Sequence, residues 1–180
     1  MAVPRGPSPD DQHAERLSGV AFDPVFIIGD HRSGTTVLYQ LLAETGAFNV
    51  VTAYDVICYG EIVDNHLACR TAAARQALAE RFRLMGLADR GIDGVAVTPD
   101  LPEEYGFIID YSGRPQISPR TLDRFVEVCR KIRFVGENRP VLLKSPWDVL
   151  TFAYIKATFP RARFVFVHRH PMHVMTSQLS

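Results

Sequence analysis

A glycine-bounded loop between an apolar run and a predicted helix carries the residues best suited to chemistry. The loop runs from Gly29 to Gly34, and it places Ser33, Thr35 and Thr36 at the start of the helix. Helix N-termini attract oxyanions because unpaired N–H groups and the positive end of the dipole converge there. The two glycines have P-loop spacing, but Thr35 stands where a nucleotide triphosphatase has its lysine. We therefore expect a phosphate-like group here, and not the γ-phosphate of ATP.

Three basic residues follow the three clearest predicted strands. Arg32 lies in the loop after the first strand, Lys144 follows the apolar run 141–143, and Arg169 follows the run 164–167. In an open parallel sheet, ligands bind beyond the carboxyl ends of the strands. Cations gathered at one helix N-terminus would suit a ligand with several negative charges. A nucleotide with phosphates at two positions is the natural candidate.

The order of apolar runs and amphipathic segments predicts an α/β fold. We expect a three-layer arrangement: a parallel sheet with a P-loop-like strand-loop-helix and helices on both faces. The helix that begins after Gly34 is predicted to bury a stripe of apolar residues, namely Val37, Leu38, Leu41 and Leu42. Residues 1–20 are rich in proline and glycine and are expected to form a flexible tail, with one α/β domain over 21–180. The expected strands are 25–28, 48–52, 141–143 and 164–167, and helices are expected after residue 34, at 71–85, after 118, at 147–159 and after 171, with 90–119 irregular.

Composition excludes several classes of function. Twenty basic residues balance twenty acidic ones, so no bulk field would attract nucleic acid or an anionic membrane. Three scattered cysteines, Cys58, Cys69 and Cys129, are too few for a disulfide framework or a zinc site, and free thiols suit a reducing compartment. The chain has neither a membrane-span-length apolar run nor a signal-peptide pattern, so we expect a cytoplasmic protein. No pattern predicts an oligomeric state.

Three segments together resemble the sulfotransferases that use 3′-phosphoadenosine-5′-phosphosulfate (PAPS). The segment 32–36 is similar to their 5′-phosphosulfate loop. The run 164–171 is similar to their 3′-phosphate element, in which an arginine ending a strand and a serine eight residues later hold the 3′-phosphate; Arg169 and Ser177 keep that spacing. Lys144-Ser145-Pro146, followed by a helix and Phe159-Pro160, is similar to a segment of the tyrosylprotein and bacterial branches. The resemblance covers 25–55 and 139–180, leaves 56–138 without a matching motif, and implies that the C-terminal part of the domain is absent.

This resemblance implies transfer of a sulfuryl group from PAPS to a hydroxyl or amine of a small-molecule, glycan, lipid or phenol acceptor. It implies that Arg32 brackets the leaving 5′-phosphate and that Lys144 meets the bridging or sulfuryl oxygens. No divalent metal is expected, because a sulfuryl group carries less charge than a phosphoryl group. The implied donor-binding residues are Arg32, Ser33, Gly34, Thr35, Thr36, Arg169 and Ser177.

The residue that removes the acceptor's proton is less clearly marked. Many cytosolic members have Lys-Thr-His at the strand end, with the histidine as base, whereas here the third position is Pro146. The tyrosylprotein branch uses a glutamate shortly after the first helix, and Asp55 lies nearest that position, with Glu61 as the alternate. A carboxylate can act as base if burial raises its pKa or if the acceptor is acidic, like a phenol.

Two other functions fit parts of the pattern. A P-loop kinase or nucleotide triphosphatase would use the glycine loop, with 107–110 as a strand and Asp110 as a magnesium ligand, although a turn after a short strand also fits 107–110. A non-catalytic nucleotide-binding module would use the same loop without turnover. His168, His170 and His173 invite a metal-site interpretation, but they lack a carboxylate partner and the usual helical spacing.

Overall fold

In the computed structural model, four parallel strands form one sheet in the order β2-β3-β1-β4. The structure describes residues 6–89, 95–110 and 115–179, with the side chains of 177–179 outside the description. β1 lies in the middle and pairs with β3 on one side and β4 on the other; Ile27 is in register with Lys144, and Ile28 with Phe166. The strands are β1 (Pro24–Ile28), β2 (Asn49–Val50), β3 (Val141–Lys144) and β4 (Arg163–Phe166).

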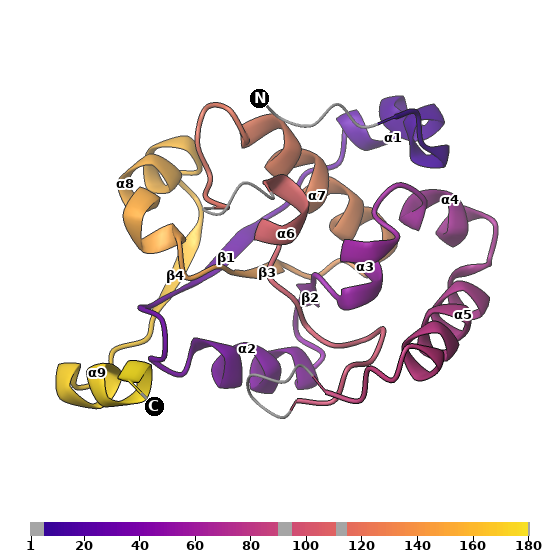
Figure 1. Ribbon diagram of the computed structural model, residues 1–180. Helices are drawn as coiled ribbons and strands as arrows, with labels where there is room; N and C mark the ends of the chain where they lie inside the picture. The colour runs from indigo at the N-terminus through magenta and orange to yellow at the C-terminus, as the bar shows by residue number, and fades with distance from the viewer. Residues whose placement is uncertain (1–5, 90–94, 111–114, 180) are drawn as a thin grey trace.

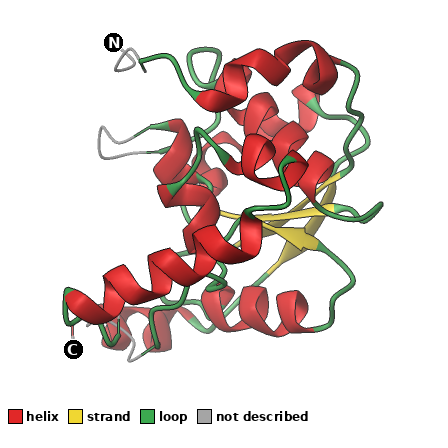
Figure 2. Ribbon diagram, turned by 90° about the vertical axis from the view of Figure 1, so that its right-hand side faces the viewer, coloured by secondary structure: helices red, strands yellow, loops and turns green. Residues whose placement is uncertain are grey.

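Helices lie on both faces of the sheet, so the expected three-layer α/β arrangement is confirmed (Figures 1 and 2). In Figure 1, α2 (Thr35–Glu44) lies below the sheet, and α7 (Leu122–Val135) and α8 (Asp148–Thr158) lie above it. The remaining helices are η1 (Pro9–His13), α1 (Ala14–Ser18), α3 (Ala53–Ile57), α4 (Ile62–Leu67), α5 (Thr71–Leu84), α6 (Gly106–Ile109) and α9 (Pro171–Leu179).

The two faces of β1 explain why the helices take these places. Successive strand residues point to opposite faces, and every residue of β1 is buried. Val25 and Ile27 pack with Tyr39 of α2, whereas Phe26 belongs to the larger core on the other face. There its ring stacks on Phe125 of α7 at 5.9 Å between centroids. β1 therefore lies between two hydrophobic layers, and packing on both sides fixes the position of its carboxyl end.

The buried face of α2 differs from the predicted one. Val37 and Leu41 are 60% and 57% exposed, whereas Thr35 and Tyr39 are buried. The residues that face the sheet follow the spacing i, i+3, i+4, i+7 from Thr35. Neighbouring residues such as Val37 and Leu38 point in directions about 100° apart, so the predicted stripe mixed two faces of the helix.

The expectation of a flexible tail over 1–20 is wrong for residues 9–18, whereas residues 1–5 of that predicted tail lie outside the described part of the chain. Residues 9–18 form η1 and α1, which pack against α4 and α7. Leu17 is 5% exposed and joins the main core. The proline-rich composition was a poor guide because the anchoring contacts are made to residues far along the chain.

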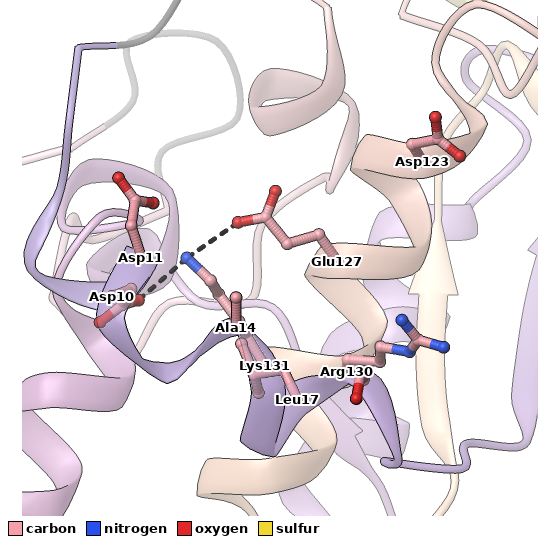
Figure 3. A pocket seen from close by; sticks show the side chains of 9 residues that line it. Asp10, Asp11, Ala14, Leu17, Asp123, Glu127, Arg130 and Lys131 are labelled. Atoms are coloured by element: carbon pink, nitrogen blue, oxygen red, sulfur yellow. Dashed lines mark ion pairs between the residues drawn. The ribbon is translucent and has the colours of Figure 1, made fainter.

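A buried charged cluster holds this N-terminal segment in place. One oxygen of Asp10 accepts hydrogen bonds from the backbone N–H groups of Val63 (3.1 Å) and Asp64 (2.9 Å), so Asp10 caps the first turn of α4. Its other oxygen lies 2.9 Å from the ammonium of Lys131 on α7, which also lies 3.0 Å from Glu127. Figure 3 shows Lys131 between the two carboxylates, in a pocket whose walls come from η1, α1 and α7.

No helix within the described ranges is both long enough and apolar enough to cross a membrane.

Candidate active site

The connections that follow β1 and β3 diverge at the carboxyl edge of the sheet. The chain leaves β1 for α2 on one face, whereas it leaves the neighbouring β3 for α8 on the other face (Figure 1). Adjacent strands whose connections diverge in this way leave a crevice at their carboxyl ends, and open α/β sheets bind ligands there. The loop 29–34 and the turn 145–147 follow these two strand ends, and the rings of His31 and Trp147 make an edge contact between them at 5.2 Å.

The loop after β1 is shaped by its glycines. A Cβ atom at Gly29 would lie 2.8 Å from the Ser33 hydroxyl, 2.8 Å from the Thr35 methyl and 2.9 Å from the Val167 carbonyl oxygen, so a larger residue cannot fit. Gly34 has φ +98°, which glycine adopts without strain. Arg32 has φ +66° and is therefore held in the left-handed region without being glycine. Strain of this kind persists where the surrounding structure enforces it, commonly at ligand sites.

The start of α2 offers hydrogen-bond donors to an anion. Its first-turn N–H groups have no carbonyl partner within the helix, because the ladder begins with the N–H of Leu38 bonding to the carbonyl of Gly34 at 3.1 Å. The Ser33 hydroxyl is buried and has no hydrogen-bond partner among the described residues. A buried donor without a partner is costly unless a ligand or water satisfies it. The loop thus has hydrogen-bond donors of the kind that the expected 5′-phosphosulfate group requires.

Lys144, the last residue of β3, lies beside this helix start. Alternation along β3 points Lys144 to the same face as Leu142, which packs with α2. Its ammonium donates a hydrogen bond to the Thr36 hydroxyl at 3.2 Å and forms an ion pair with Glu104. The Lys144 side chain is only 7% exposed. A cation held this firmly against a helix N-terminus can stabilise negative charge that develops there.

Arg169 contacts the same loop from the other side of β1. Its guanidinium donates a hydrogen bond to the backbone carbonyl of Arg32 at 3.1 Å. The N–H of Val167 bonds to the carbonyl of Ile28 at 2.8 Å, which extends the pairing of β1 and β4 to the start of the loop. The structure therefore brings together the three segments that carry Arg32, Lys144 and Arg169. Ser177 falls within α9, but its side chain lies outside the described residues, so its contact with a 3′-phosphate stays a prediction.

Asp55 is engaged in capping a helix. One of its oxygens accepts hydrogen bonds from the N–H (2.8 Å) and the hydroxyl (2.7 Å) of Thr52, and its own N–H donates back to that hydroxyl at 3.3 Å. Burial raises the pKa of Asp55, and the hydrogen bonds from Thr52 and the charge of Arg75 oppose that rise. This arrangement is a capping box at the start of α3. Glu61 is exposed and lies just before α4.

The structure does not support the magnesium ligand expected for a P-loop kinase or nucleotide triphosphatase. Residues 107–109 lie in the single helical turn α6, so neither a strand nor a turn after a strand is present there. Asp110 instead forms an ion pair with Arg120 at 2.5 Å. No three His, Cys, Asp or Glu side chains in the described parts of the chain are grouped as a metal site.

Glu104 is a site residue that the sequence analysis missed. It lies 40 residues from Lys144 in the chain, within a stretch expected to be irregular, and forms the ion pair described above. Its neighbour Tyr105 is fully buried and donates a hydrogen bond to Asp148, at the start of α8. Burial raises the pKa of Asp148 to about 8, and the negative charge of Glu104 adds to that rise. In the sequence, the only local signal was a pair of acids followed by a tyrosine.

Residues 24–180 match the family model described as "Sulfotransferase family". The chain belongs to the sulfotransferase family. The match includes the loop 29–34, Lys144 and Arg169, which the structure places at one edge of the sheet.

Curated relatives and a solved structure agree with this assignment. The chain is 25% identical over 185 residues to the omega-hydroxy-beta-dihydromenaquinone-9 sulfotransferase Stf3 of Mycobacterium tuberculosis and of Mycobacterium bovis, covering 89% of this chain and 45% of each relative. The crystal structure of sulfotransferase STF9 from Mycobacterium avium has the same fold, with a TM-score of 0.69 at 18% identity, covering 94% of this chain and 48% of that one. The chain thus spans about half the length of the relatives it matches.

Proposed function

We propose that this chain forms the donor-binding core of an enzyme that transfers a sulfuryl group from PAPS to an acceptor hydroxyl or amine. The observation that carries the proposal is the hydrogen bond from the Lys144 ammonium to the Thr36 hydroxyl, which joins the end of β3 to the helix start. It sets a cation beside the donors where an anionic group would bind. Family membership supports PAPS as the donor.

Each residue of the site has a defined task in this proposal. Ser33, Gly34, Thr35, Thr36 and the first-turn N–H groups of α2 hold the 5′-phosphosulfate. The Ser33 hydroxyl, which has no hydrogen-bond partner within the described part of the chain, supports this fit. Arg32 neutralises the leaving phosphate, and Lys144 neutralises charge on the sulfuryl oxygens in the transition state. Arg169 and Ser177 bind the 3′-phosphate. PAPS supplies the activated sulfuryl group, and no metal is needed for this chemistry.

We propose a hydroxyl of a lipid-like or other small molecule as the acceptor. The name of the Stf3 relatives states a modified menaquinone as their substrate. Apolar side chains remain exposed on β4 and α9 of this chain, among them Phe166, Met172 and Met175. These exposed apolar side chains support an apolar acceptor class.

Calorimetric titration with adenosine 3′,5′-bisphosphate, the product nucleotide, tests the proposal. The protein should bind the bisphosphate equally well with and without a metal chelator, and should bind Mg²⁺-ATP more weakly. Preference for Mg²⁺-ATP would favour the P-loop kinase alternative, and no binding of either nucleotide would contradict the proposal. A screen for transfer of radiolabelled sulfate to phenols, sugars and lipid alcohols then separates an enzyme from a non-catalytic binding module.

A further inference from the structure

The segment that carries Glu104 is fixed on both sides. The N–H of Glu103 bonds to the carbonyl of Val51 at 2.8 Å, just beyond the end of β2. On the other side, Tyr105 is fully buried and its hydroxyl is hydrogen-bonded to Asp148 on α8. Glu104 therefore stands at the carboxyl edge of the sheet on a backbone that leaves it little freedom.

The carboxylate of Glu104 contacts the candidate site through Lys144. It is paired with Lys144, whose ammonium also contacts Thr36 at the start of α2. The two paired side chains are 17% (Glu104) and 7% (Lys144) exposed. An ion pair this far from water adds little net stability, because desolvation of both charges offsets their attraction. A role in the chemistry of the site explains this placement better than stability does.

Asp55, the base suggested by the family resemblance, is less well placed. It is 3% exposed, and one carboxylate oxygen already accepts two hydrogen bonds from Thr52. These bonds hold Asp55 in the capping box of α3, and among the described residues it has no hydrogen bond to Lys144 or to the start of α2. Glu104, in contrast, touches the cation that the proposed reaction uses.

We propose that Glu104 is the proton acceptor of the transfer reaction, an assignment that rests on the proposed function. The acceptor oxygen forms a bond to sulfur, and the bond between sulfur and the bridging oxygen breaks. The electron pair of that bond stays on the 5′-phosphate of the leaving bisphosphate, next to Arg32 and Lys144. The proton of the acceptor hydroxyl passes to the Glu104 carboxylate and from there to water.

The test compares Glu104→Gln with Asp55→Asn, using phenols of different acidity as acceptors. Loss of the proton acceptor should slow transfer to phenol, which keeps its proton at mildly alkaline pH. It should hardly change transfer to 4-nitrophenol, which is largely ionised at that pH. General-base catalysis contributes about 100-fold or more to a rate. Glu104→Gln should therefore lower transfer to phenol by about 100-fold and leave transfer to 4-nitrophenol within about threefold, whereas Asp55→Asn should affect both acceptors equally.

Binding of adenosine 3′,5′-bisphosphate provides the readout that does not depend on activity. Glu104→Gln should bind the bisphosphate at least as tightly as the unsubstituted protein, because Lys144 no longer has a competing carboxylate. Glu104→Asp, which retains the charge and shortens the side chain, is the second variant and should show an intermediate loss with phenol.

Two outcomes would overturn this assignment. One is equal losses with both acceptors in Glu104→Gln, which indicate a positioning role. The other is unchanged transfer to phenol in Glu104→Gln. Failure of the unsubstituted protein to bind the bisphosphate would instead contradict the proposed function itself.

Discussion

The ammonium of Lys144 lies 3.2 Å from the hydroxyl of Thr36, although the two residues are 108 positions apart in the chain. One ends a buried strand and the other begins a helix that packs on that strand. Their contact, together with the Lys144–Glu104 ion pair, combines a cation, helix-terminal donors and a carboxylate within one site.

Substituting Lys144 should separate its catalytic role from its role in stability. Lys144→Met should lower kcat/KM by about 30- to 1,000-fold, since one preorganised donor contributes about 2–4 kcal/mol to the transition state. The same change leaves the partly buried Glu104 without its cation and should lower the free energy of unfolding. The double variant Lys144→Met/Glu104→Gln should recover much of that stability, because the unpaired charge is gone. Recovery of sulfate transfer in the double variant would contradict the role given to Lys144.

The buried cluster at the N-terminal segment predicts a large effect on stability away from the site. Lys131 is 1% exposed and contacts Asp10, Glu127 and the carbonyl of Tyr59. Lys131→Met should lower the free energy of unfolding in urea by about 3–5 kcal/mol, the usual effect of removing one partner of a buried ion pair.

The matched control is Lys156→Met, on the exposed side of α8, which should change stability by less than about 0.5 kcal/mol. Equal effects of the two substitutions would indicate that the N-terminal segment is not held by this cluster.

The raised pKa of Asp148 predicts how the free energy of unfolding depends on pH. Burial raises its pKa to about 8 in the folded protein, whereas an unfolded aspartate has a pKa of about 3.9. Between about pH 4 and pH 8 the folded state therefore binds a proton that the unfolded state releases. The contribution of Asp148 to the free energy of unfolding is fully present below about pH 4. It decreases as pH rises toward 8, by at most about 1.4 kcal/mol per pH unit.

Asp148→Asn should remove this dependence, because the amide does not titrate and its oxygen can still accept from Tyr105. Urea unfolding of both proteins across this pH range checks the prediction. Parallel stability curves for the two proteins would show that Asp148 does not titrate in this way.

The parts of the fold that sequence alone predicted depend on local patterns. A fully apolar run predicted β1, and two spaced glycines before hydroxyl residues predicted the loop and the start of α2. The cations Lys144 and Arg169 were found because each lies within two residues of the end of an apolar run. The rule that strand ends meet at one edge then brought them together.

The parts that were missed depend on contacts between distant residues. Asp10 is buried because it caps α4 and pairs with Lys131, and nothing near Asp10 in the sequence indicates this. Glu104 reaches Lys144 because its segment is tied to Val51 beyond β2, in a region without helical or strand periodicity. Long-range pairing of this kind leaves no pattern in a single sequence.

The central claim is that cations at this sheet edge bind a nucleotide phosphorylated at both ends of its ribose. Calorimetry with Arg169→Ala tests it most directly, using adenosine 3′,5′-bisphosphate and adenosine 5′-monophosphate as ligands. Loss of one charged hydrogen-bonding partner is worth about 1.5–3 kcal/mol. We predict that affinity for the bisphosphate falls by about 10- to 100-fold while affinity for the monophosphate stays nearly unchanged, with Arg161→Ala, an exposed arginine next to β4, as the control. Equal losses for both nucleotides, or no loss for either, would contradict the claim.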